Sequence, residues 1–372
     1  MEPKVTIKDI AKNTGTSVAS VHRALHGGSG VGKDLRRRIL EEAKRCHYQI
    51  DESASLLRRS TLQITVLLPK PEKDERFYYR GLWQGITREA ARLQRVKASV
   101  RMIETAYGVD QIARALENLY DETNRLNERM DGLVTICDDE ESAAWIRRFM
   151  HRGTAVALVD RSLPIEGIAC CVEVGVADMG RAAMELAALY CTQAGKESGI
   201  VLINSSRHRS SARVFSNAAR ERMQQIWGEC APGLTEYSEA TEQAVRSILR
   251  KMLQTSPPPA VITASARSTF WVCDEIVRFY AQYPHRRKER PPVIGTDLFP
   301  EQARFFEDGT LKATIYQSHL TSGEQCMSHL FDYLVGLDSS AGTVLPQPLC
   351  IIMKDNYRSF LANDLHKNKM IV

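Results

Sequence analysis

Residues 5–27 read VTIKDIAKNTGTSVASVHRALHG, and this stretch decides the fold of the amino-terminal part of the chain. Thr6 stands three residues before an aspartate, a capping-box pattern that predicts the start of a helix. That helix should end at Gly15, because glycine accommodates the positive φ of a helix end. Ser17 is suited to cap a second helix over residues 18–26. The pattern therefore predicts two short helices joined by a tight turn.

A third helix follows the glycine-rich run at residues 27–30. It is predicted from Lys33 to about Cys46, with three consecutive arginines on its outer side. Two short helices around a glycine turn, with a third behind them, indicate a helix-turn-helix module that lays its second helix in the major groove of DNA. The apolar positions predicted to face the core of this module are Ile7, Ile10, Ala11, Val21, Leu25, Leu35, Ile39, Leu40 and Ala43.

The net charge of the chain, +5, is concentrated in its first sixth. Residues 1–60 carry 12 Lys and Arg against 7 Asp and Glu, and the remaining residues are neutral overall. A compact basic module joined to a neutral body is the electrostatic pattern of a nucleic-acid-binding protein. On charge alone, a solvated basic face is an equally good interpretation.

From Leu62 onward the pattern changes to short apolar strands that alternate with helical stretches. Such alternation predicts an α/β fold with parallel sheets and right-handed crossovers. Ligands of these folds bind outside the carboxyl ends of the strands, so the polar residues that follow each strand are the candidates for a binding site. The predicted strands are 64–68, 98–103, 132–136, 155–159, 199–203, 260–263 and 292–295.

The amino-terminal sequence resembles the DNA-binding headpiece of the LacI/GalR family of bacterial regulators. The T-I-K-D-I-A, G-T-S-V-A-S-V and R-A-L elements of residues 5–27 keep the order and spacing found in that family. The stretch VGKDLRRRILEEAKRCHYQI, residues 31–50, has its helix end in Tyr48, as the third helix of the family does. The resemblance implies a homodimeric transcriptional regulator, usually a repressor, that binds double-stranded operator DNA.

The resemblance assigns DNA contacts to individual residues. Val18 and Ala19 occupy the two base-reading positions of the recognition helix, where their methyl groups suit thymine. Arg23 matches the arginine of the family, and a guanidinium can pair with guanine O6 and N7. The hinge of the family becomes helical on DNA and wedges a leucine, here Leu57, into the minor groove. The DNA-binding residues so implied are Thr6, Ser17, Val18, Ala19, Ser20, His22, Arg23, His26, Ala54, Leu57 and Arg58.

Several positions depart from the family pattern. His22 stands where the family usually has serine, and His26 where it usually has asparagine. Gly32 replaces the usual serine cap of the third helix, and Ile50 replaces the proline before the hinge. These differences leave the operator sequence open. A plain charged linker over residues 50–61 is the alternative to a hinge helix.

The body is similar to the two-lobed periplasmic sugar-binding proteins, whose fold this family shares. Aspartates accept hydrogen bonds from adjacent hydroxyls, and arginines donate to ring oxygens or acidic groups, so polar residues at the strand ends imply a sugar-like effector. Arg267 stands near a position where many relatives have Asn-Asp, which leaves a charged sugar open. The effector-binding residues so implied are Phe77, Tyr78, Asp160, Arg161, Arg213, Ser265, Asp297 and Gln317.

The resemblance also implies the architecture: a small all-α helix-turn-helix headpiece, then a two-lobed α/β body of the type I periplasmic-binding-protein kind with parallel sheets. Three crossings of the chain join the lobes, and an effector in the cleft is expected to change the lobe angle. In a dimer that angle sets the spacing of two headpieces, whose half-sites lie about one helical turn apart. The expected boundaries are 1–49 for the headpiece, 50–61 for the hinge, 62–162 with 320–338 for the amino-terminal lobe, and 163–319 with 339–372 for the carboxy-terminal lobe.

The sequence also bears on location and on competing functions. The amino terminus has no apolar run of the secretory type, so we expect a cytoplasmic, nucleoid-associated bacterial protein. This opposes a sugar-binding transport protein and leaves a cytoplasmic sugar-binding module without specific DNA binding as the alternative. We do not expect an enzyme, because no H-E-x-x-H motif or nucleophile elbow is present in the sequence.

Two further motifs point to no cofactor. Residues 27–34 fit G-x-x-x-x-G-K but end in Asp34, where a phosphate-binding loop has the Ser or Thr that holds magnesium. We therefore interpret this run as a turn between helices. Nine cysteines without C-x-x-C spacing predict reduced thiols and no structural metal.

Overall fold

The computed structural model describes residues 7–25, 31–46, 60–73, 76–106, 108, 110–137, 139–161, 164–191, 199–204, 210–238, 241–337 and 341–366. These residues form two compact units. The first contains the described residues up to 60 together with 335–337, and the second contains the rest. No helix in the described stretches is long and apolar enough to cross a membrane.

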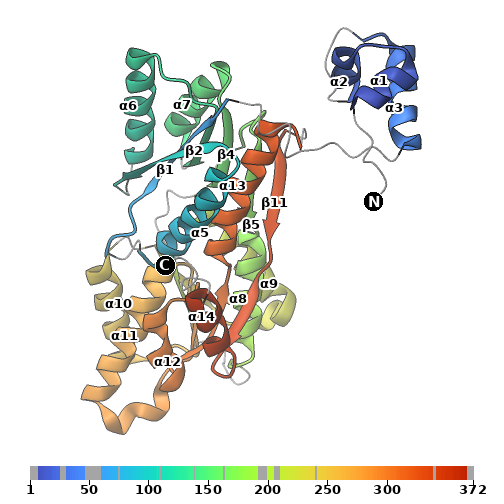
Figure 1. Cartoon of the computed structure of the whole chain (residues 1–372). Coiled ribbons are helices and arrows are strands. Elements are labelled where there is room, and N and C mark those ends of the chain that lie inside the picture. The colour runs from blue at the N-terminus through green and yellow to red at the C-terminus, as the bar shows by residue number, and fades with distance from the viewer. Residues whose placement is uncertain are drawn as a thin grey trace. The chain divides into compact units, whose positions relative to one another are not determined.

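Three helices form the first unit (Figure 1): α1 (Ile7–Thr14), α2 (Val18–Leu25) and α3 (Lys33–Arg45). Gly15 follows α1 with a φ of +64°, in the left-handed region that glycine favours. Ser17 caps α2, because its hydroxyl accepts a hydrogen bond from the Ser20 backbone N–H at 3.1 Å. Both features confirm the predictions. The shared core of the three helices consists of Ile10, Ala11, Val21, Ala24, Ile39 and Ala43.

One predicted core residue of α3 is wrong. Leu40 is 43% exposed, whereas Ile39 is fully buried. Each helical residue is turned about 100° from the one before it, so the buried stripe passes through Ile39 and, one turn later, Ala43. Leu40 lies just outside that stripe.

The second unit contains two six-stranded sheets, and this confirms the two-lobed α/β architecture. The first sheet is parallel throughout, in the order β11-β5-β4-β3-β1-β2. The second has the order β12-β10-β9-β8-β6-β7, in which only the β10–β12 pair is antiparallel. The strands of the first sheet are β1 (Leu62–Pro69), β2 (Ala98–Thr105), β3 (Gly132–Cys137), β4 (Ala155–Arg161), β5 (Cys170–Val174) and β11 (Thr343–Gln347). Those of the second are β6 (Ile200–Asn204), β7 (Leu234–Ser238), β8 (Val261–Thr263), β9 (Val293–Thr296), β10 (Leu311–Tyr316) and β12 (Cys350–Met353).

Each lobe has its own helices. Those of the first lobe are α5 (Arg76–Gln94), α6 (Gln111–Leu126), α7 (Glu140–His151) and α13 (His319–Val335). Those of the second are α8 (Val176–Ala188), α9 (Ser210–Trp227), α10 (Glu242–Thr255), α11 (Ala266–Gln282), α12 (Ala303–Glu307) and α14 (Tyr357–His366). Short 3-10 turns occur at Gly228–Cys230, Pro284–Glu289 and Pro300–Gln302.

Helices cover both faces of the second sheet. Met179 of α8 and Phe215 of α9 belong to one buried cluster, and Leu249 of α10 and Ile276 of α11 belong to another. The strands that separate the two clusters are therefore buried on both sides, which explains why their sequences are almost continuously apolar.

The predicted boundaries between the lobes need a correction. Residues 170–174 and 343–347 were assigned to the second lobe, but β5 pairs with β4 and β11 pairs with β5 in the first sheet. The chain therefore crosses between the lobes near residues 175, 318 and 349. The expected number of crossings, three, is correct, and the error arose because neither β5 nor β11 is buried along its whole length, so no continuous apolar run marks them.

Helix α13, the last helix of the first lobe along the chain, packs very closely on α5. A Cβ atom added at Gly85 would overlap the carbonyl oxygen of Leu320, and one added at Gly323 would overlap that of Leu82. The two helix backbones therefore touch, and this contact fixes the first turn of α13 beside the amino-terminal half of α5. Residues of both segments then face the second lobe.

Candidate functional site

Two predicted site residues, Asp297 and Gln317, stand where neighbouring strands of the second sheet end. Asp297 directly follows β9 and Gln317 directly follows β10. The Asp297 backbone is in the left-handed region, with a φ of +64°. Its N–H donates to the Ile315 carbonyl at 2.8 Å, and its carbonyl accepts a hydrogen bond from the Thr314 hydroxyl at 2.7 Å. The strand ends thus hold this unusual backbone in place.

The Asp297 carboxylate is the centre of a buried polar cluster. Its Oδ1 atom lies 2.9 Å from His319 Nε2 and accepts a hydrogen bond from Gln317 Nε2 at 3.4 Å. The Tyr78 ring packs against His319, with 4.3 Å between ring centroids. Tyr78 and His319 belong to first-lobe helices, so the cluster joins the two lobes. We refer to Tyr78, Asp297, Gln317 and His319 as the interlobe cluster.

His319 was not predicted as a site residue. It is 7% exposed at its side chain and begins α13, two residues after Gln317. The only signal in the sequence was this closeness to a predicted residue, since its main partner lies 22 residues earlier in the chain. A histidine ring nitrogen can donate to the carboxylate or accept from a ligand hydroxyl, depending on its tautomer.

The cluster contains a polar atom that lacks a partner. Gln317 Oε1 is buried and has no hydrogen bond to any described residue, and the same holds for the nearby Thr296 hydroxyl. Buried polar groups are nearly always hydrogen-bonded, because an unmade bond costs about 1 to 3 kcal/mol. A ligand hydroxyl placed beside Gln317 would satisfy this acceptor.

Phe77 makes an apolar contact between the lobes instead of joining Tyr78. Its ring stacks on Phe299 with 4.0 Å between centroids and lies 5.5 Å from Phe270 of α11. With Ala266 these residues form a small buried cluster. The two neighbouring predicted residues, Phe77 and Tyr78, therefore reach different partners.

The other predicted effector residues are more scattered. Ser265 caps α11, accepting from the Ser268 N–H at 3.3 Å, which leaves its hydroxyl already engaged. Arg213 is exposed on α9. Asp160 and Arg161 are the last two residues of β4, and their side chains lie outside the described part of the structure. Arg267 lies over the Trp271 ring, 5.7 Å from its centroid.

The predicted DNA-binding residues that can be placed lie at the start of α2. Val18 is 42% exposed, and Ala19 is exposed beside it. The Ser17 and Ser20 hydroxyls are 2.9 Å apart, so they bond to each other. His22 and Arg23 lie in α2, but their side chains are outside the described residues, as are the whole of Thr6, His26, Ala54, Leu57 and Arg58.

A hydrogen bond from the amide of Asn13 to the carboxylate of Glu42 joins α1 to α3 in the same unit. Glu42 accepts hydrogen bonds from Asn13 Nδ2 and from the Arg45 guanidinium, each at 2.7 Å. The bond from Arg45 is the largest of the causes that lower the pKa of Glu42 from its ordinary 4.5 to about 2. Among the described residues, no group of three or more His, Cys, Asp or Glu could hold a metal ion.

Residues 67–338 match a family model described as "Periplasmic binding protein domain". The chain belongs to this periplasmic binding protein family. The match contains the crossings near residues 175 and 318 and the interlobe cluster, and it ends before the last strand of each sheet, β11 and β12. The three helices of the first unit lie before the matched residues.

Two proteins of similar sequence are named as transcriptional regulators. HTH-type transcriptional regulator pepR1 of Lactobacillus delbrueckii subsp. lactis is 28% identical over 148 residues, 39% of this chain and 40% of the relative. HTH-type transcriptional regulator MalR of Streptococcus pneumoniae is 29% identical over 145 residues, 37% of this chain and 40% of the relative. The chain thus spans about two fifths of the length of these relatives.

Solved structures share the fold. The Lac repressor bound to ONPG aligns with a TM-score of 0.58 and 18% identity, covering 94% of this chain and 98% of the repressor. GanP, a glucose-galactose binding protein from Geobacillus stearothermophilus, aligns with a TM-score of 0.64 and 19% identity, covering 79% of this chain and 98% of GanP. Together with the names of the relatives, these alignments confirm the resemblance to LacI-type regulators.

Proposed function

We propose that this protein is a sequence-specific DNA-binding repressor whose affinity for operator DNA is controlled by a sugar-like effector between its lobes. The observation that carries the proposal is the exposed start of α2. Val18 is 42% exposed on a helix whose other side packs into a closed core. An apolar side chain held outward beside a helix cap suits contact with base edges in the major groove.

In this proposal α1, α2 and α3 form a helix-turn-helix headpiece. Val18 and Ala19 contact thymine methyl groups, and Arg23 reads guanine through O6 and N7. Residues 50–61 act as the hinge, in which Leu57 enters the minor groove and Arg58 contacts phosphate. The supporting observations are the headpiece core and the names of the relatives.

The proposed effector is a polyol that binds at the interlobe cluster. Asp297 would accept bonds from two ligand hydroxyls, and Gln317 Oε1 would accept a third that no described residue supplies. Asp160, Arg161, Arg213 and Ser265 remain proposed effector residues. Because His319 reaches Asp297 from the other lobe, a ligand that competes for this carboxylate changes the contact holding the lobes together.

The proposal includes a symmetric assembly. A homodimer presents two headpieces to half-sites about one helical turn apart, and a change in lobe angle changes their spacing. The proposed role is binding rather than catalysis, and the proposed location is the cytoplasm, on the nucleoid. We keep 1–49 as the headpiece and 50–61 as the hinge, and move the lobe boundaries to the observed crossings.

Titration of the purified protein with duplex DNA from upstream of its own coding sequence tests this proposal. The titration is repeated across a salt series, with and without a panel of sugars and sugar phosphates. Affinity should fall about a thousandfold or more between about 50 and 200 mM salt, and one compound of the panel should shift it. A panel with no effect on DNA binding would contradict effector control.

Two variants separate base reading from general charge. Arg23→Gln should reduce the preference for the upstream duplex over random DNA about tenfold or more, since a bidentate arginine contributes about 1 to 3 kcal/mol of discrimination. Arg37→Gln is the control, because Arg37 is exposed on α3 and pairs only loosely with Asp34 at 3.5 Å. It should leave the preference unchanged. If Arg23→Gln prefers the upstream duplex over random DNA as strongly as the unaltered protein does, Arg23 does not contact the bases.

A further inference from the structure

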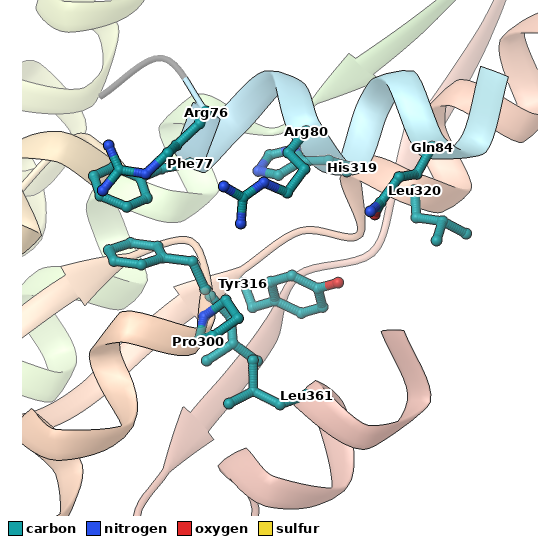
Figure 2. Close-up of a pocket in the computed structure, with 12 residues that line it drawn as sticks. Arg76, Phe77, Arg80, Gln84, Pro300, Tyr316, His319, Leu320 and Leu361 are labelled. Atoms are coloured by element: carbon teal, nitrogen blue, oxygen red, sulfur yellow. The ribbon is translucent and has the colours of Figure 1, made fainter. Parts of the chain in front are cut away.

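A cavity of about 190 Å³ lies between α5 and the second lobe, next to the interlobe cluster, with which it shares one lining residue, His319. From α5 it is lined by Arg76, Phe77, Arg80 and Gln84, and across from them by Tyr316 and Leu361. Asp297, Gln317 and Ser265 are not among its described lining residues. Figure 2 shows the α5 side chains facing Pro300, Tyr316 and Leu361 across this space.

The walls of the cavity are mainly apolar. Leu298, Pro300 and Leu361 come from the second lobe, and Leu320 comes from the first turn of α13. Such a lining holds water poorly and favours the apolar part of a ligand. The volume equals that of about six water molecules in the liquid, enough for one ring or a short branched chain.

The polar side of the cavity is cationic. The Arg80 guanidinium points from α5 into the space toward Tyr316 (Figure 2), and Arg80 is exposed. Arg76 pairs with Glu301 at 3.6 Å, whereas Arg80 makes no ion pair or hydrogen bond with any described residue. The cavity therefore combines an apolar interior with one positive charge that no described carboxylate compensates.

We propose that this cavity is a second ligand site, which binds a small organic acid made of a carboxylate and an apolar body. The carboxylate would bind Arg80 through two parallel N–H···O bonds, the geometry that a guanidinium favours. The Gln84 amide reaches the same side and can donate a further bond (Figure 2). The body of the acid would lie against Leu298, Pro300 and Leu361. A free inorganic anion would leave these apolar walls uncovered.

The position of the cavity gives the acid a regulatory effect. Its walls come from both lobes, so a ligand bound there favours the lobe arrangement in which α5 and α14 lie at their present separation. The polyol proposed for the interlobe cluster depends on the same arrangement. The two ligands would then change each other's affinity by the same factor.

Isothermal titration calorimetry with benzoate tests the site, with benzamide as the uncharged analogue of the same shape. Benzoate should bind at least tenfold more tightly than benzamide. Arg80→Gln should lower benzoate affinity about tenfold or more and leave benzamide binding unchanged. Arg95→Gln is the matched control, because Arg95 is exposed just beyond α5 and lies outside the cavity.

Two further variants separate this cavity from the interlobe cluster. Leu361→Trp would fill the cavity and should abolish benzoate binding, whereas Asp297→Asn should retain it. Circular dichroism establishes that each variant is folded. The proposal is overturned if benzoate does not bind, if Arg80→Gln and Arg95→Gln weaken it equally, or if Asp297→Asn removes it while Leu361→Trp does not.

Discussion

The two units of the chain are stabilised in different ways. The headpiece has a buried core of six residues, four of them alanine or valine, and two of its helices are further joined by a hydrogen bond to the Glu42 carboxylate. The body has extensive cores on both faces of its second sheet and buries carboxylates inside it. The headpiece therefore depends on each contact it makes, and the body can lose one contact and remain folded.

The buried charges of the body show the contrast most clearly. Glu275 is 1% exposed at its side chain and accepts hydrogen bonds from Arg246 at 3.2 Å and Arg250 at 2.8 Å. Its neighbour Asp274 is bonded by Arg246 and Arg304, each at 2.8 Å. In the headpiece, the bond between Arg45 and Glu42 is solvent-exposed on the arginine side. Because the carboxylates of Asp274 and Glu275 are buried, salt should screen their ion pairs little. The exposed Arg45–Glu42 pair of the headpiece should respond to both salt and pH.

The largest effect should come from the headpiece core. Ile39→Ala removes a fully buried side chain, which costs about 2 to 5 kcal/mol. A core of this size supplies about 3 to 5 kcal/mol in total. The headpiece should therefore unfold at room temperature while the body stays folded, and native-state hydrogen exchange measures this directly.

The matched substitution in the body is Ile276→Ala, which also truncates a fully buried isoleucine. It should leave the headpiece protected and lower the unfolding temperature of the body by roughly 10 °C at most. If both variants lose protection from hydrogen exchange only in the body, the headpiece is not the less stable of the two units.

A smaller loss is expected from the ionic network. Glu275→Ala leaves Arg246 and Arg250 without one of their carboxylates and should lower the free energy of unfolding of the body by about 2 kcal/mol, less than for a fully buried pair because Arg250 is half exposed. Glu275→Gln should lose less, since it keeps an acceptor. Chemical denaturation of the two variants gives the comparison, and an equal loss would show that the charge contributes nothing.

The headpiece should also lose stability in acid. Because Glu42 has its pKa lowered from 4.5 to about 2 in the folded state, its contribution is complete above about pH 4.5 and disappears as the pH falls toward 2. Far-UV circular dichroism from pH 6 to 2 would follow this loss. Glu42→Gln should remove the pH dependence in this window, and Glu41→Gln, exposed on the same helix, should keep it.

The smallest effect is expected at Leu40. This side chain is 43% exposed, so Leu40→Gln should change the free energy of unfolding of the headpiece by less than about 0.5 kcal/mol. The measurement is the same hydrogen-exchange experiment used for its neighbour Ile39. A loss as large as that of Ile39→Ala would place Leu40 in the core after all.

Features that depend on local sequence could be predicted. The end of α1 at Gly15 and the cap at Ser17 follow from residues within one helical turn. Most buried strands have continuous apolar runs, so they could be recognised, and with β9 the position of Asp297 at a strand end.

Features that depend on distant contacts could not be predicted. The missed strands β7, β11 and β12 are at sheet edges, and their side chains are mostly half-buried or exposed, so no apolar run marks them. The fourth missed strand, β5, lies inside the first sheet, but only its first three residues are buried. His319 becomes a site residue only because the start of α13 lies beside Asp297. Phe77 meets Phe299 because the lobes bring α5 to that loop. Neither contact leaves a trace in local sequence.

The central claim is that the exposed start of α2 reads a specific DNA sequence. The most direct test compares the affinity of the full chain for its own upstream duplex with that for a scrambled duplex of equal length and composition, at physiological salt. We predict at least a thousandfold preference for the upstream duplex, the lower end for specific binding proteins. Equal affinity for both duplexes would contradict the claim and leave the chain as a ligand-binding body with a basic but non-reading headpiece.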